Sequence, residues 1–132
     1  SAPRMIAPQV NLGNTYLQEG RLKDAEAVYE SALALDPWAM EAWSNLGVLR
    51  ARRGDWRAAF DAFERATIIA PNFLDCHSNL AEAAVRLGRW RAAADAYRRV
   101  LAGTPGDRDA AEGLRAAERR LGIGGAFSPA AK

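Results

Sequence analysis

The chain has 132 residues, of which 49% are hydrophobic and 26% are charged, so it has enough apolar side chains for a folded domain. Its 18 basic and 16 acidic residues interleave and give a formal net charge of +2, which argues against a nucleic-acid partner. No apolar run approaches the ~20 residues of a membrane span, so we expect no membrane insertion. The only cysteine, Cys76, cannot form an internal disulfide. A reducing compartment fits it, and we expect a cytoplasmic location.

Residues 1–5, SAPRM, are expected to be a leader or a cloning remnant. From residue 6 onward the sequence repeats, because NLGNTYLQEG, NLGVLRARRG and NLAEAAVRLG begin at residues 11, 45 and 79, a period of 34 residues. Alanine and arginine are abundant and β-branched residues are few, which favours helices over strands. We expect three units of two helices each, at 6–39, 40–73 and 74–107. The first helices are expected at about 6–19, 40–53 and 74–87, and the second helices at about 22–35, 56–69 and 90–102.

Glycine and proline punctuate each unit. A glycine follows each first helix, where it can adopt the left-handed conformation that ends a helix without a clash at Cβ. A proline follows each second helix, which it cannot continue. The glycines are Gly20, Gly54 and Gly88, and the prolines are Pro37, Pro71 and Pro105.

Small residues are expected to face each other inside each helix pair and to leave room for one aromatic ring. They are Gly13, Gly47 and Ala81 opposite Ala25, Ala59 and Ala93, with Tyr29, Phe63 and Tyr97 as the rings. We also expect Leu12, Leu46 and Leu80 to lie in the core, and Trp38 to pack between units.

These spacings resemble the tetratricopeptide repeat, whose 34-residue pattern contains Trp, Leu-Gly, Tyr, Ala, an aromatic residue, Ala and Pro. The resemblance implies an all-α fold, a right-handed α-solenoid of three helix-turn-helix hairpins. The segments AWSNLG and PNFLD are most similar to the repeat arm of O-linked N-acetylglucosamine transferases. The matching residues of the middle unit are Trp43, Leu46, Gly47, Gly54, Ala59, Phe63, Ala66 and Pro71, whereas Gln9 and His77 replace Trp in the other units.

Residues 108–121, RDAAEGLRAAERRL, are predicted to form a capping helix. Small and apolar residues follow one side of it and charged residues cover the other, as expected of a helix that shields the last edge of a repeat array. The segment at 122–132, GIGGAFSPAAK, contains the glycines and the proline of a flexible tail.

The recurring asparagines, Asn11, Asn45 and Asn79, lie about 100° around the helix from the core leucines. The resemblance implies that the first helices line a concave groove, which would contain these side chains. One amide offers an acceptor and two donors, which match the N–H and carbonyl of a peptide unit. We therefore predict that the row binds an extended peptide of a partner protein by its backbone. A solvated row, with binding elsewhere, is the alternative.

Polar residues that flank the asparagines are expected to set the peptide preference. They are Asn14, Glu41, Ser44, Arg52, Asp75, Ser78 and Arg86. A carboxylate clamp, which binds the acidic C-termini of heat-shock chaperones in some members of the family, is not expected. Its three cations are replaced here by Val10, Asp75 and Asn79.

The sequence contains no pair of catalytic carboxylates, no nucleophile with a base and no phosphate-binding loop. We therefore predict a protein-interaction module without catalysis, cofactor or metal. Two alternatives stay open at this point. One is an assembly scaffold or self-associating adaptor that acts through its convex face or its ends, and the other is the substrate-selecting arm of a larger enzyme such as a glycosyltransferase.

Overall fold

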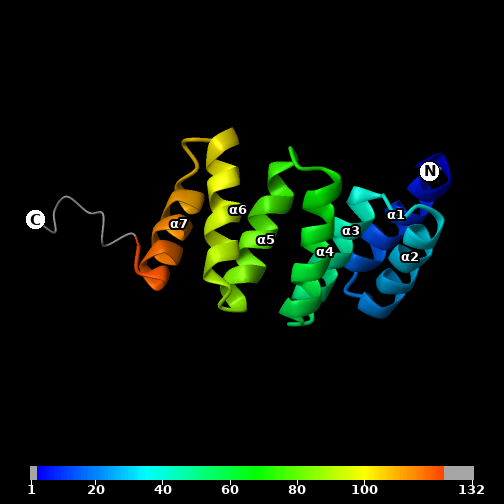
Figure 1. The fold of residues 1–132 in the computed structure, drawn as a ribbon. Helices are drawn as coiled ribbons and strands as arrows, with labels where there is room; N and C mark the ends of the chain where they lie inside the picture. Colours follow the sequence, from blue (N-terminus) through cyan, green and yellow to red (C-terminus); the bar gives the residue numbers. More distant parts are fainter. Residues whose placement is uncertain (1–2, 124–132) are drawn as a thin grey trace, which may run out of the picture. The chain divides into compact units, whose positions relative to one another are not determined.

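The computed structural model describes residues 3–123, with side chains from Ile6 onward, and within this range it contains seven helices and no strand (Figure 1). The predicted all-α class is confirmed. The helices are α1 (Pro3–Gln18), α2 (Leu22–Leu35), α3 (Met40–Arg52), α4 (Trp56–Ile69), α5 (Leu74–Arg86), α6 (Trp90–Gly103) and α7 (Arg108–Leu121).

The first helix differs from its expected start. It begins at Pro3 and continues through Pro8, so residues 3–5 are helical. Ser1, Ala2 and the 124–132 part of the expected tail lie outside the described residues.

The helices belong to two compact units, Ser1–Asn72 and Phe73–Lys132, called unit 1 and unit 2 below. Within unit 1, α1 packs against α2 and α3 against α4, and α3 also packs against α1 and α2. Within unit 2, α6 packs against both α5 and α7, as Figure 1 also shows. Consecutive helices therefore pair as the repeat pattern predicts, whereas the right-handed superhelix stays a prediction.

Glycines end the first helix of each repeat in the predicted conformation. Gly20, Gly54 and Gly88 have φ angles of 78°, 80° and 71°. Gly122, one repeat length after Gly88, ends α7 in the same way with φ 76°. The capping helix therefore keeps the register of a first helix, so the repeat period extends to the end of the described chain.

Glycines also make room for the aromatic rings inside the helix pairs. A Cβ atom on Gly13 would lie 2.5 Å from Cε1 of Tyr29, and one on Gly47 would lie 2.5 Å from Cε1 of Phe63. No side chain can occupy these positions while the rings stay in place. The predicted fit between the small residues and the aromatic residues is therefore confirmed in unit 1.

The core of unit 1 includes Leu46 and Leu49 of α3, which pack with Tyr29 of α2 and Leu17 of α1. Leu46 is buried as predicted, but Leu12, at the same repeat position in α1, is 44% exposed. The reason is that Leu46 lies against the α1–α2 pair that precedes it, whereas no helix precedes α1 in the described chain. The prediction of a core position for Leu12 was wrong.

Trp38, in the loop between α2 and α3, was expected to pack between the first and second repeats. The structure leaves its side chain 65% exposed. Its backbone N–H donates a 3.0 Å hydrogen bond to Oδ1 of the buried Asp36, which stabilises the turn. Within unit 1, Trp38 is therefore a surface residue.

Candidate functional site

The candidate site begins with the asparagines of the first helices, which the structure places at or near the surface. Asn11 is exposed, and Asn45 and Asn79 are half-buried. Within residues 3–123, the side-chain amides of Asn11 and Asn79 form no hydrogen bond. These two amides keep their full set of donors and acceptors for another molecule.

Asn45 has a hydrogen-bond partner inside unit 1. Its Nδ2 donates to Oδ1 of Asn14 over 2.7 Å, and the hydroxyl of Tyr29 donates to the same oxygen over 2.5 Å. Asn14 was predicted to contact the peptide, but its acceptor is filled by these two donors. Asn45 retains its own Oδ1 and its second N–H, so it can still contact a ligand with one acceptor and one donor.

Tyr29 is the member of this network that the sequence did not indicate as functional. It shares its repeat position with Phe63 and Tyr97, which suggested only a role in packing. Its hydroxyl, which Phe63 lacks, was the signal in the sequence for a hydrogen bond. The side chain is completely buried. Burial raises the pKa of Tyr29 to about 12, and the charge of Glu41 adds to the shift, whereas Arg52 opposes it.

We expect unit 1 to lose stability as the pH rises from 10 to about 12. An unfolded tyrosine ionises near pH 10, but folded Tyr29 keeps its proton to about pH 12, so the stabilisation present below pH 10 is lost across this range. The slope should be about 1.4 kcal/mol per pH unit. Urea unfolding followed by circular dichroism between pH 8 and 11.5 measures it.

The matched control for this titration is Tyr29→Phe. This variant should be about 1 kcal/mol less stable at pH 8, because it loses the hydrogen bond to Asn14, but its stability should fall less steeply above pH 10. Equal slopes for the two proteins would show that Tyr29 does not account for the alkaline loss.

The predicted arginines also have partners within their own units. Arg52 donates from Nη1 to the backbone oxygen of Leu17 over 2.8 Å, near the C-terminus of α1, where a cation is favourable. Arg86 lies 3.8 Å from Glu82, one turn before it on α5. Arg52 therefore links α3 to α1, Arg86 pairs along α5, and both also present charge at the surface.

The other predicted residues lie on α3 and α5, the helices of Asn45 and Asn79. Glu41, Asp75 and Ser78 are exposed, and Ser44 is half-buried. Of these, only Ser78 reaches the cavity described next. The sequence placed all of them at one peptide site, and that assignment stays a prediction.

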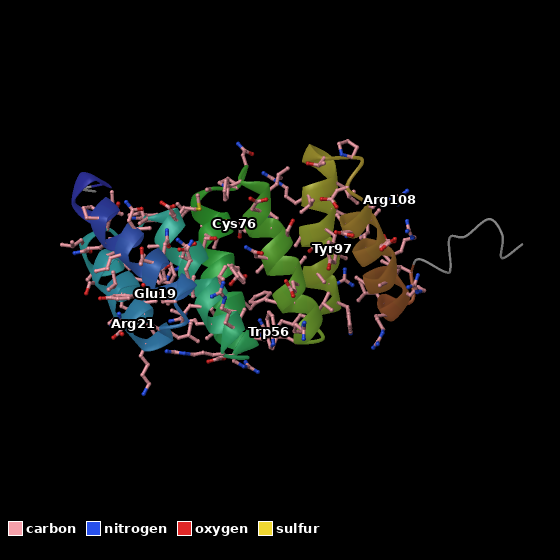
Figure 2. The ribbon with its side chains drawn as sticks, turned by 180° about the vertical axis from the view of Figure 1, so that it is seen from behind. Glu19, Arg21, Trp56, Cys76, Tyr97 and Arg108 are labelled. Carbon is pink, nitrogen blue, oxygen red and sulfur yellow. The ribbon has the colours of Figure 1, made fainter. Side chains whose placement is uncertain are left out.

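Unit 2 contains a cavity of about 300 Å³ between α5, α6 and α7. Figure 2 shows Tyr97 between α6 and α7, with Arg108 at the start of α7. The sequence did not indicate most of this site, although Asp109 could have been found because it continues, at the same period, the acidic positions Glu41 and Asp75. The lining residues are Ser78, Glu82, Tyr97, Asp107, Asp109 and Ala110.

Two of these carboxylates act electrostatically on the Tyr97 hydroxyl. Burial raises the pKa of Tyr97, and the negative charges of Glu82 and Asp109 raise it further. Asp107 caps α7 by accepting a 3.0 Å hydrogen bond from the backbone N–H of Ala110. The cavity is therefore polar and acidic.

Residues 3–123 contain no group of three or more histidine, cysteine, aspartate or glutamate side chains arranged to hold a metal ion. None of the seven helices in that range combines the length and apolar character needed to cross a bilayer.

Two sequence profiles of the tetratricopeptide repeat match this chain, over residues 10–72 and 50–118. The second alone spans more than half of the chain. The chain belongs to the tetratricopeptide repeat family. This tetratricopeptide repeat protein has no match among curated proteins.

Solved structures agree with the family assignment. MamA is 25% identical to this tetratricopeptide repeat protein over 93% of this chain and 72% of its own, with a TM-score of 0.82. The first repeat domain of Spaghetti (RPAP3), bound to the HSP90 peptide SRMEEVD, is 21% identical over 89% and 95% of the chains, with a TM-score of 0.78. The second repeat domain of human RPAP3, in complex with the HSP70 peptide SGPTIEEVD, is 20% identical over 88% and 98%, with a TM-score of 0.79.

The RPAP3 likenesses establish the fold and no more. None of these three structures is an O-linked N-acetylglucosamine transferase, so the finer resemblance to that repeat arm stays a prediction.

Proposed function

We propose that this chain is a protein-interaction module that binds an extended peptide of a partner protein. Asn11, Asn45 and Asn79 contact the peptide backbone, each from the first helix of its own repeat. The availability of their amides carries the proposal, because the side-chain amides of Asn11 and Asn79 form no hydrogen bond within residues 3–123 and Asn45 keeps one acceptor and one donor. Flanking polar residues set the preference for side chains, and no catalytic step is involved.

The RPAP3 repeat domains support a peptide as the ligand, because both hold a peptide in their structures. Those peptides are acidic at the C-terminus. In this chain, the positions that would bind such a carboxylate hold Val10, Asp75 and Asn79, so an acidic C-terminus would meet a carboxylate and no cation. We therefore propose a partner segment that is neutral or basic.

Three amides supply only a few kcal/mol, because one hydrogen bond contributes roughly 0.5–1.5 kcal/mol. Binding by the amides alone is therefore expected to be weak, in the micromolar to millimolar range. A narrower hypothesis is that the chain is the substrate-selecting arm of a larger enzyme such as a glycosyltransferase. The sequence of the full-length gene product tests it.

Asn45→Ala should weaken peptide binding at least about fivefold, because the peptide backbone loses a donor and an acceptor. The variant should also lose about 1 kcal/mol of stability, since Asn45 donates to Asn14 within unit 1. This cost exceeds the negligible change expected of a solvated asparagine. Peptides selected from a random display library serve as the probe, and calorimetry measures their affinity.

Ser31→Ala is the control for this variant, because Ser31 is exposed on α2, a second helix. Backbone N-methylation of the selected peptide provides a sharper test. If Asn45 contacts one peptide N–H, methylation there should weaken wild-type binding and leave little further effect of Asn45→Ala. Unchanged affinity in Asn45→Ala would refute the proposed role of this residue.

Self-association is a second candidate function, because unit 1 exposes apolar side chains. Leu12, Leu35 and Trp38 are 44%, 46% and 65% exposed. Exposed aromatic and aliphatic groups favour contact with another protein surface. Light scattering over a range of concentrations tests this function, and a monomeric mass at every concentration would contradict it.

A further inference from the structure

The cavity in unit 2 has a filled counterpart in unit 1. Each of its lining residues lies two repeat lengths after a residue of α1, α2, α3 or the turn that leads into α3. The two sets therefore occupy the same positions of the repeat, and they can be compared one by one. In the order of the cavity lining, the counterparts are Val10, Asn14, Tyr29, Ala39, Glu41 and Ala42.

In unit 1 the chain fills this position with its own side chains. Val10, Ala39 and Ala42 pack together in a buried apolar cluster. In addition, Nδ2 of Asn45 donates a hydrogen bond to Oδ1 of Asn14, and this oxygen also accepts one from the hydroxyl of Tyr29. A side-chain N–H from α3, the first helix of the next repeat, therefore satisfies the acceptor of Asn14.

In unit 2 the internal donor is missing. Gly113 of α7 is the counterpart of Asn45, and a Cβ atom there would collide with the ring of Tyr97. Ser78 replaces the larger Val10, and Asp107 replaces Ala39. The Tyr97 hydroxyl makes no hydrogen bond within residues 3–123, unlike that of Tyr29. These replacements leave the acceptors of the cavity open to a donor from another molecule.

The charges of the lining residues determine which kind of hydrogen-bond donor the cavity favours. Glu82 stands where unit 1 has the neutral Asn14, and Asp107 and Asp109 add two more carboxylates. One cation, Arg86, lies 3.8 Å from Glu82, and the N-terminus of α7 partly offsets Asp107 and Asp109. The net charge of the lining stays negative, so a charged N–H donor is favoured over a neutral one.

We propose that this cavity binds a cationic side chain, the guanidinium of an arginine or the ammonium of a lysine, from a partner protein. Glu82 and Asp109 accept its N–H groups, and Tyr97 lies beside it. A volume of about 300 Å³ accommodates one such side chain. This site goes beyond the backbone contacts of the asparagine row, since it reads one side chain of the partner and lies wholly within unit 2.

The probe is the tripeptide Gly-Arg-Gly, acetylated and amidated at its ends, with its citrulline analogue as the neutral isostere. Amide chemical shifts of the isotope-labelled chain are followed by NMR. We expect saturable shifts at Ser78, Glu82, Tyr97 and 107–110, in the millimolar range, at least about tenfold weaker for citrulline. Higher salt should weaken the arginine peptide and leave citrulline unchanged.

Two variants separate the shape of the cavity from its charge. Ser78→Val introduces the residue found at this position in unit 1 and should fill the cavity. The double variant Glu82→Gln with Asp109→Asn should remove most of its negative charge. Each should lower the affinity for the arginine peptide at least about fivefold. Asp61→Asn, an exposed carboxylate of α4, is the control and should bind as the wild type.

Equal binding of the arginine and citrulline peptides, or shifts spread over other surface carboxylates, would overturn the proposal. The tripeptide is too short to test the asparagine row, so failure here leaves the peptide-backbone proposal standing. Conversely, a null result for Asn45→Ala with a longer peptide does not affect this site.

Discussion

Gly47→Leu should lower the free energy of unfolding by about 3 kcal/mol. Even the first added atom would lie 2.5 Å from Cε1 and 2.6 Å from Cδ1 of Phe63. Both residues are buried, and Ala59 and Ala62 of the same helix are completely buried beside the ring, so it has little room to move. The better helix propensity of leucine offsets less than ~1 kcal/mol of this cost. Urea unfolding followed by circular dichroism measures the loss.

A double-mutant cycle identifies the cause. Phe63→Ala should cost about 3–5 kcal/mol by leaving a cavity, and Gly47→Leu added to it should cost much less than it does alone, because the new side chain can occupy the vacated space. Gly106→Leu is the control, since Gly106 has open space around it and no positive φ. Additive losses would show that Phe63 is not what limits the size of residue 47.

Leu46→Ala should cost about 2–5 kcal/mol, whereas Leu12→Ala should cost about 1 kcal/mol or less. The two leucines share one position of the repeat and the same sequence context, Asn-Leu-Gly. Leu46 is 1% exposed in a cluster with Tyr29 and Leu17, and Leu12 is 44% exposed. The substitution removes the same atoms from both, so the difference reports burial alone. Equal costs in urea unfolding would show that another surface covers Leu12.

Much of the fold could be predicted because its signals are local. Gly20, Gly54 and Gly88 end helices because only glycine adopts a positive φ without a clash. The pairing of Gly13 with Tyr29 and Gly47 with Phe63 also followed from the repeat, since each member of a pair stands at a constant position of a unit. For such residues the period of the sequence carries the structural information.

The candidate site was less predictable, because it depends on the neighbours that each side chain has. Asn45 and Asn79 occupy one repeat position, but Asn45 finds an acceptor in Asn14, 31 residues before it, whereas the residue at the same spacing before Asn79 is Val48, whose side chain has no acceptor. Whether an amide is free or bonded therefore differs between units with the same local sequence. The cavity beside Tyr97 was missed for the same reason. To find it from the sequence, one has to notice that Gly113 of α7 stands at the repeat position of Asn45 and lacks its side-chain amide.

The sequence by itself determined the helices, their ends apart from the start of α1, and the family, because backbone conformation and packing within a helix pair depend on residues at a constant spacing. Only the tertiary structure decided the exposure of Leu12 and Trp38, the hydrogen bonds that occupy Asn14, and the open acidic cavity of unit 2. Burial and hydrogen-bond satisfaction are set by contacts between helices, and those contacts change from one repeat to the next even where the pattern does not.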